Sequence, residues 1–350
     1  MSGGVDSSVA AFLIKEKGFD CIGATMKLFH NEDIGLSRGH TCCSLEDVED
    51  ARDVCYKLGI DHFVFNFSDR FRETVVEPFI KSYENGITPN PCIECNRYLK
   101  FEKLIRRAKE LGIDYVVTGH YARIVFDEKT EKFMLKKALD PTKDQSYVLY
   151  SMTQEQLSHT LFPLGEYSKT ETRKIAADQG FLNAQKHDSQ DICFIPNGDR
   201  IAFMERYTGR SCPKGSFTDL QGNILGRHKG IIHYTVGQHK KLGIGFDKPM
   251  YVCSIFPESN TVVLGEEKDL YSSEAVVCDF NWISGEAPKE PFRCKAKVRY
   301  RQPEQPATVV PLDEGKVKII FDEPQRAITP GQAAVLYDEE TVLGGGTVAR

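Results

Sequence analysis

Residues 2–8 of the chain read SGGVDSS, and this stretch decides the fold class. It stands directly before a helix predicted over residues 7–17, which Gly18 closes. Gly3 and Gly4 let the backbone approach an anion closely, and the helix N-terminus adds hydrogen-bond donors and about half a positive charge. A glycine turn with a serine cap explains an isolated Ser-Gly-Gly, but it explains the whole heptad less well. The sequence therefore predicts a phosphate-binding loop.

The remaining residues of the loop indicate which phosphate it holds. The hydroxyls of Ser7 and Ser8 can donate to phosphate oxygens, whereas the carboxylate of Asp6 would repel them unless a cation lies between. We therefore expect Asp6 to bind Mg²⁺ at a pyrophosphate. The stretch matches neither G-x-x-x-x-G-K-[ST] nor G-x-G-x-x-G, which disfavours a γ-phosphate transferase and a dinucleotide enzyme. Such a loop normally follows a strand, so we expect the natural N-terminus to lie upstream of Met1.

Outward from the loop, helix and strand signals alternate as far as about residue 207, which indicates an α/β domain with a parallel sheet. The predicted helices and strands after the first helix are a strand over 20–26, a helix over 45–58, a strand over 62–67, a helix over 96–111 and a strand over 115–118. Short strands and turn signals then take over, with a break near Glu274. We expect an α/β domain over 1–207, a small β-rich domain over 208–274 and a C-terminal β-barrel over 275–350.

The composition is that of an ordinary globular protein with more than one domain. The 350 residues carry 45 Lys and Arg against 50 Asp and Glu, a net charge of −5, so a nucleic acid would need a local basic patch. No apolar run approaches the roughly 18 residues of a membrane helix, and the N-terminus has no secretory pattern. We expect a cytoplasmic protein without a membrane partner. Eleven cysteines, an odd number, argue for thiols, metal ligands or catalysts and against a disulfide framework.

Two cysteines stand in contexts that favour chemistry. Cys95 ends the stretch TPNPCIEC before the predicted basic helix, where the helix dipole would stabilise its thiolate. Cys193 lies in HDSQDICFIP, and taken alone it is more simply a buried structural thiol. Cys92 and Cys95 also form a C-x-x-C pair, which supports a redox dithiol, an iron–sulfur site with Cys193, or a zinc site completed by His40, Cys42 and Cys43. Neither metal site is favoured.

A basic stripe lies near the C-terminus, where cations recur at every second residue: Arg293, Lys295, Lys297, Arg299 and Arg301. In a strand, successive charges would lie about 6.8 Å apart on one face and could follow a phosphate backbone. A solvated strand face is the alternative. The predicted helix face with Arg97, Lys100, Lys103 and Arg107 is equally well explained by solvation.

The sequence resembles a known family from Ser2 to its end. SGGVDSS alone is similar to the pyrophosphate loop of the ATP pyrophosphatases, the PP-loop superfamily, which includes small-molecule synthetases and tRNA thiolases. The further motifs follow in the order and approximate spacing of the bacterial tRNA-specific 2-thiouridylases, the MnmA family: TPNPCIECNRYLKF, TGHYAR, DQSYVL, DSQDICFI, YTVGQHKKLGIG, KVRYRQ and TPGQAAVLYD. The resemblance implies a PP-loop α/β domain, a small β-rich central domain and a C-terminal β-barrel that helps to hold tRNA.

The resemblance also implies ATP-dependent 2-thiolation of the wobble uridine of Lys, Glu and Gln tRNAs. ATP would adenylate the uracil O2, because C2 is a poor electrophile until its oxygen becomes a leaving group. A persulfide derived from a cysteine desulfurase would then deliver sulfur to C2. By motif, Cys95 matches the nucleophile and Cys193 the persulfide carrier. A second thiol can attack the outer sulfur of the persulfide or resolve it as a disulfide.

The same matching implies binding residues. The residues implied for ATP are Ser2, Gly3, Gly4, Val5, Asp6, Ser7, Ser8, Met26 and Gly119. The target base would face Asn90, Pro91 and Cys92, and the family usually has Asp where this chain has Cys92, which leaves a resolving or metal-binding role open for that thiol. The residues implied for tRNA are His120, Lys143, Asp144, Gln145, Arg299, Tyr300 and Gln332. His120 taken alone is better explained as a satisfied histidine at the end of a strand.

Two rival functions follow from the same residues. A small-molecule adenylating synthetase would keep its activity without Cys95 and Cys193. A non-catalytic RNA-binding or metal-binding protein would show no tRNA-dependent exchange between ATP and pyrophosphate.

Overall fold

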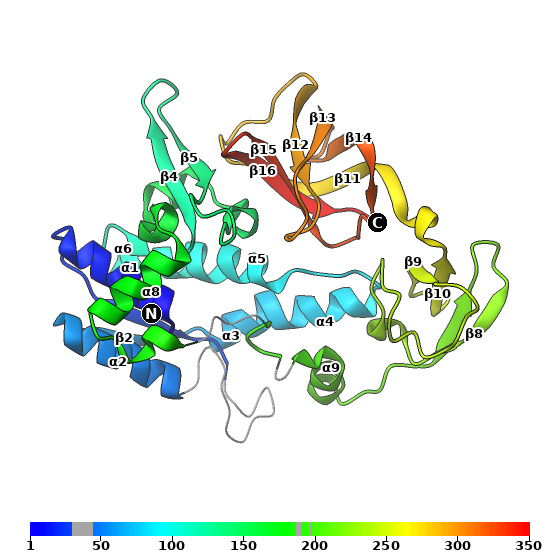
Figure 1. Cartoon of the computed structure of the whole chain (residues 1–350), viewed down its shortest axis with the longest axis horizontal. Coiled ribbons are helices and arrows are strands. Elements are labelled where there is room, and N and C mark those ends of the chain that lie inside the picture. Colours follow the sequence, from blue (N-terminus) through cyan, green and yellow to red (C-terminus); the bar gives the residue numbers. More distant parts are fainter. Residues whose placement is uncertain (30–44, 187–190, 196–197) are drawn as a thin grey trace.

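The computed structural model describes residues 1–29, 45–186, 191–195 and 198–350. An N-terminal α/β region occupies one end of the molecule, a small set of strands occupies the other, and a barrel lies beside the long helices that run between them (Figure 1). Among the helices of the described residues, none is both long and apolar enough to cross a membrane.

Two parallel strand pairs form the centre of the N-terminal region, which confirms the predicted α/β class. Strand β1 (Gly23–Lys27) pairs with β2 (His62–Asn66), and β3 (Val116–Val117) pairs with β6 (Thr160–Leu161). Apolar side chains of three helices, Val9 on α1, Val54 on α2 and Ala176 on α8, belong to one buried cluster beside these strands. The helical segments of this region are α1 (Val5–Glu16), α2 (Leu45–Leu58), α3 (Ser68–Phe71), η1 (Arg72–Val76), α4 (Glu77–Glu84), α5 (Pro91–Cys95), η2 (Asn96–Lys103), α6 (Leu104–Glu110), η3 (Ser146–Leu149), α7 (Gln154–Ser158), η4 (Pro163–Glu166), α8 (Lys169–Asp178), η5 (Leu182–Gln185) and α9 (Arg200–Thr208).

The predicted start of the basic helix was wrong. The side chain of Asn90 accepts the backbone N–H of Cys92 at 3.2 Å, and Pro91 occupies the first helical position, so helix α5 begins there. The π-helical segment η2 and helix α6 continue it without a break. Cys95 is therefore the last residue of α5, inside a longer helical run, and not a residue at a helix N-terminus. The argument that the helix dipole stabilises its thiolate does not hold.

The central strands form a separate four-stranded sheet in the order β8-β7-β10-β9. Its elements are β7 (Gly215–Thr218), β8 (Ile224–His228), η7 (Ile231–His233), β9 (Tyr251–Phe256) and β10 (Thr261–Gly265), followed by η8 (Glu267–Leu270). The next strand, β11, runs from Tyr271 to Trp282 and so passes through residue 274, where the sequence suggests a break.

The C-terminal strands close into a barrel in the order β11-β14-β13-β12-β15-β16, because β16 also pairs with β11. The strands after β11 are β12 (Phe292–Lys297), β13 (Gln305–Pro311), β14 (Val317–Arg326), β15 (Ala333–Asp338) and β16 (Thr341–Val348). A hairpin of the N-terminal region, β4 (Ala122–Asp127) and β5 (Lys132–Lys137), joins the barrel where Lys136 pairs with Thr341. The N-terminal region and the barrel thus share one continuous sheet.

The predicted basic strand is shorter than the alternation suggests. Strand β12 ends at Lys297, and residues 299–302 lie in a turn. The guanidinium of Arg299 donates to the carbonyl of Val236, the carbonyl of Ala327 and the hydroxyl of Thr329. Arg299 therefore ties the barrel to the central region, and the single cationic face predicted over 293–301 was wrong.

Candidate functional site

Loop 2–8 has the close-packed backbone that the sequence predicts. Gly3 has φ = +68°, and a Cβ at this position would lie 2.7 Å from the Cα of Asp47, so only glycine fits. The hydroxyls of Ser7 and Ser8 each donate to the carbonyl of Gly4 at 3.0 Å. These hydroxyls thereby close the first turn of α1.

Gly119 follows β3 and lies directly against this turn. A Cβ at Gly119 would come within 2.7 Å of the carbonyl carbon of Asp6 and 2.8 Å of the backbone nitrogen of Ser7. Met26 lies near the end of the parallel strand β1 and is half-buried. The structure therefore brings Gly119 to loop 2–8 through a direct backbone contact.

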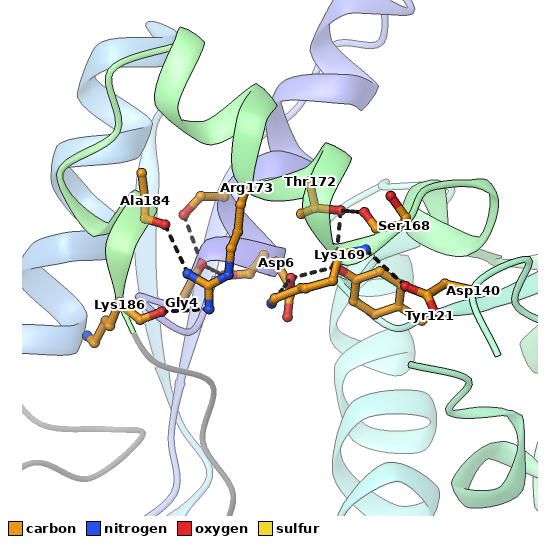
Figure 2. Close-up of polar contacts among 12 residues, drawn as sticks. Gly4, Asp6, Tyr121, Asp140, Ser168, Lys169, Thr172, Arg173, Ala184 and Lys186 are labelled. Atoms are coloured by element: carbon orange, nitrogen blue, oxygen red, sulfur yellow. Dashed lines mark hydrogen bonds and ion pairs between the residues drawn. The ribbon is translucent and has the colours of Figure 1, made fainter. Parts of the chain in front are cut away.

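Asp6 is held by two donors. Its Oδ1 accepts the hydroxyl of Tyr121 at 2.8 Å and the ammonium of Lys169 at 2.7 Å, and the Lys169 side chain is only 12% exposed (Figure 2). This pair leaves a single carboxylate in a fixed orientation beside the loop. Mg²⁺ commonly binds one or two carboxylates and completes its shell with phosphate oxygens and water, so the arrangement fits a metal that arrives with a nucleotide.

Several cationic side chains and one amide lie around loop 2–8, and none of them was predicted from the sequence. Lys186 donates to the carboxylates of Asp47 at 2.5 Å and Asp50 at 2.7 Å. The buried amide of Asn183 donates to the carbonyl of Gly3 and the hydroxyl of Ser8, both at 2.9 Å. These contacts join the loop to the segment that follows α8.

Helix α8 brings two more cations to the same place. Lys169 is its first residue, and Arg173, four residues later, donates to the carbonyls of Ala184 and Lys186 (Figure 2). The sequence did contain a signal for this helix start, because Ser168 and Glu171 form a capping box. It could not show that the helix faces a loop more than 160 residues earlier.

Cys95 is almost completely buried, whereas Cys92 is exposed. Glu94 lies between them in the sequence. Burial raises the pKa of its carboxyl, and the charge of Arg97 partly opposes this rise. The thiol of Cys95 lies in an apolar cluster with Leu99 from η2 and Phe71 from α3.

Cys193 joins the same cluster as a half-buried side chain. Its neighbour Phe194 anchors it: the ring contacts Phe71, Phe79 and Phe203 with centroids 5.5, 5.3 and 5.3 Å apart. Met26 also contacts this cluster. The structure therefore brings Cys95 and Cys193 into one apolar cluster that reaches β1. The rest of the motif, residues 187–190 and Pro196, lies outside the described residues.

Three family models divide the chain between them. Residues 1–197 match the tRNA methyl transferase HUP domain, residues 201–266 the tRNA methyl transferase PRC-barrel domain, and residues 272–348 the aminomethyltransferase beta-barrel domain. Curated relatives match over the full length. "tRNA-specific 2-thiouridylase MnmA" of Clostridioides difficile strain 630 is 49% identical, with 100% of this chain and 97% of the relative covered. The protein of the same name from Acetivibrio thermocellus is 50% identical, with 99% and 97% covered, and "tRNA-specific 2-thiouridylase MnmA 1" of Thermoanaerobacter sp. strain X514 is 50% identical, with 100% and 96% covered.

The chain belongs to the MnmA family of the PP-loop superfamily. The family's arrangement of a HUP domain, a PRC-barrel and a C-terminal β-barrel agrees with the three structural regions described above. This confirms the predicted fold class.

The residues that the MnmA resemblance implies for tRNA fall into two groups. In the first, Tyr300 donates its hydroxyl to the carbonyl of Asp144 at 3.2 Å, which brings the turn after β12 to segment 143–145. The side-chain oxygen of Gln145 accepts the backbone N–H of Tyr121, next to the Asp6 site. Lys143 lies in the same short segment, where its backbone N–H donates to Asp140.

The second group has other contacts. Gln332 donates to the carbonyl of Thr88 at 2.9 Å, in the loop that leads to Asn90 and Pro91. His120 is buried, with Nδ1 2.7 Å from the hydroxyl of Thr118 and its ring against Phe101 and Phe162. Burial, with a smaller contribution from Lys100, holds the pKa of His120 well below 6.5, so the imidazole stays neutral.

The described residues contain no ligand cluster of the kind that the iron–sulfur hypothesis needs. In the described part of the chain, no group of three or more His, Cys, Asp or Glu side chains is placed to hold a metal ion. His40, Cys42 and Cys43, the proposed zinc ligands, lie outside the described residues.

Proposed function

We propose that this chain is an ATP-dependent tRNA 2-thiouridylase that acts on the wobble uridine of Lys, Glu and Gln tRNAs. The observation that supports the proposal most is the shared apolar cluster of Cys95 and Cys193, which are far apart in the sequence. The cluster reaches strand β1 through Met26, one of the residues that the resemblance implies for ATP. A synthetase that only adenylates a small molecule has no need for two thiols there.

The first step is adenylation of the base. The uracil O2 attacks the α-phosphorus of ATP, the bond to the β-phosphate breaks, and pyrophosphate leaves. Loop 2–8 would bind the pyrophosphate through backbone N–H groups, and Lys169 and Arg173 would balance its charge. Asp6 is the residue that would hold Mg²⁺, which when bound would neutralise phosphate charge.

The second step transfers sulfur. A cysteine desulfurase would supply a persulfide on Cys193, and its outer sulfur attacks C2 of the activated uridine while AMP leaves with the former O2. The thiolate of Cys95 then attacks the inner sulfur on Cys193. The sulfur–sulfur bond breaks, its electron pair stays with the sulfur on C2, and a Cys95–Cys193 disulfide forms. An external thiol reductant reopens that disulfide. A largely buried apolar setting keeps water from hydrolysing the adenylated base.

The test supplies ATP, Mg²⁺, cysteine, a cysteine desulfurase and unmodified tRNA, and measures 2-thiouridine by mass spectrometry. We expect product from the wild type and none above background from Cys95→Ser or Cys193→Ser. Both variants should still release pyrophosphate in a tRNA-dependent single turnover. Cys294→Ser is the matched control, because burial raises the pKa of that thiol on β12 to about 12 and makes it inert. Thiolation by either test variant at the wild-type rate would refute the proposal.

A further inference from the structure

The loop between α4 and α5, residues 85–90, is held by two other regions of the chain. At its start, Gly86 approaches the central sheet so closely that a Cβ would lie 2.9 Å from the Cγ2 of Ile255. At its centre, the backbone N–H of Thr88 donates to the carbonyl of Pro330 at 3.0 Å. The side chain of Gln332 donates to the carbonyl of Thr88 at 2.9 Å. Figure 1 shows this segment turning back beneath the barrel before it enters α5.

The barrel loop on the other side, residues 329–332, is built for this close approach. Gly331 has φ = +87°, and a Cβ there would lie 3.0 Å from the carbonyl oxygen of Thr88 and would overlap the side chain of Ile87. Its first residue, Thr329, is buried and accepts the guanidinium of Arg299 at 2.6 Å. The loop is thus rigid on the barrel side and in contact with the α4–α5 loop.

Helix α5 is linked to the barrel beyond its C-terminal end as well. Asn96, the residue after Cys95, donates its side-chain amide to the carbonyl of Val148 at 2.9 Å. In the same segment, the hydroxyl of Tyr147 donates to the carbonyl of Ala333 at 2.7 Å, directly after the 329–332 loop. The short helix that carries Cys92 and Cys95 is therefore fixed to the barrel from both sides.

We propose that barrel loop 329–332 is a latch that positions helix α5, with Gln332 as its positioning residue. Through this latch, the position of the Cys95 thiol depends on the barrel. A tRNA that binds the barrel would therefore influence the position of this thiol through the hydrogen bonds of the latch, in addition to any direct contact between the RNA and the site. This part of the inference rests on the proposed function. The mechanical link itself, from the barrel to α5, does not.

The test compares Gln332→Met, which keeps the side-chain length but removes the donor, with Gln305→Met. Gln305 lies on the same barrel, and among the described residues its side chain donates only to the nearby carbonyl of Pro303, so it is the matched control. Hydrogen–deuterium exchange of peptide 87–96 is measured on the full-length protein without tRNA or ATP. A neutral hydrogen bond contributes about 1 kcal/mol, so we expect exchange to become about fivefold faster in Gln332→Met and to stay unchanged in the control.

Steady-state thiolation gives the second readout. A positioning role predicts that kcat falls about fivefold in Gln332→Met, whether or not KM for tRNA also rises through the tRNA contact that the MnmA resemblance implies for this residue. Unchanged exchange of peptide 87–96 would overturn the latch, and so would a rise in KM at constant kcat, which would make Gln332 a direct tRNA contact. If exchange accelerates while the wild type forms no 2-thiouridine, the latch stands and the proposed function fails.

Discussion

The replacement Gly119→Ala tests whether loop 2–8 is the nucleotide site. The added methyl group would lie 2.7 Å from the carbonyl carbon of Asp6 and 2.8 Å from the nitrogen of Ser7, both backbone atoms. Ordinary contact begins near 3.4 Å, so the first turn of α1 must move by roughly 0.7 Å. A shift of this size disturbs the donors of the loop, while overpacking costs about 1–3 kcal/mol of stability.

The expected effect on binding is larger than the effect on folding. Displacing a substrate by about 1 Å can cost on the order of a hundredfold in rate, so we expect ATP affinity and tRNA-dependent pyrophosphate release to fall at least tenfold. The melting temperature should fall by about 2–4 °C for each kcal/mol lost. Equilibrium dialysis with labelled ATP measures the affinity, a coupled assay measures pyrophosphate release, and far-UV circular dichroism checks the fold.

Gly245→Ala is the matched control. A Cβ at Gly245 would have no atom of the described residues within 4 Å, and the residue has no left-handed φ, so the same chemical change there should leave ATP binding and pyrophosphate release unaltered. If Gly119→Ala binds ATP and releases pyrophosphate like the wild type, loop 2–8 is not the nucleotide site.

Two further predictions follow from single side chains. Lys169→Met should lower tRNA-dependent pyrophosphate release about tenfold, because a hydrogen bond to a charged group contributes about 1.5–3 kcal/mol. Lys174→Met is the control, because Lys174 is an exposed residue of the same helix. Equal rates of pyrophosphate release in the two variants would contradict the role of Lys169. His120 is neutral in the folded protein, but the unfolded chain binds a proton below pH 6.5, so stability should fall with decreasing pH by at most about 1.4 kcal/mol per unit. His120→Gln should lose less stability than the wild type between pH 7.5 and 5.5 in thermal melts, and identical losses would count against the burial argument.

Local sequence signals predicted the elements that local physics determines. The helix over 45–58 begins and ends at the predicted residues, because an acidic first turn and Gly59 mark its boundaries. The start of α5 was missed although the sequence carries a signal for it, because an Asn cap followed by Pro, here Asn90 and Pro91, is typical of a helix start.

The environment of the candidate site was less predictable, because it depends on distant contacts. Nothing in the sequence near Lys169 indicates that its ammonium pairs with Asp6. Nothing near Arg299 indicates that its guanidinium donates hydrogen bonds to carbonyls of both the central region and the barrel. The alternating cations around Arg299 indicated a strand face, but alternation does not reveal which charges are paired. Arg293, for example, is held by Asp322 at 2.5 Å.

All three regions of the chain contribute to the burial or the position of helix α5. The apolar cluster that contains Cys95 extends without interruption into the central sheet, where it includes Phe217, Val252 and Val262. The 329–332 loop of the barrel donates a hydrogen bond to the loop before this helix, and Met26 of strand β1 packs against the same apolar cluster. The proposed attack of the Cys95 thiol on a persulfide would need both burial and a fixed position. Burial of Cys95 comes from the α/β region together with the central sheet, whereas the barrel fixes the loop before it. Loss of either neighbouring region should therefore weaken sulfur transfer more than it weakens ATP binding, because the contacts of loop 2–8 with Asp47, Gly119 and Asn183 all lie within the N-terminal region.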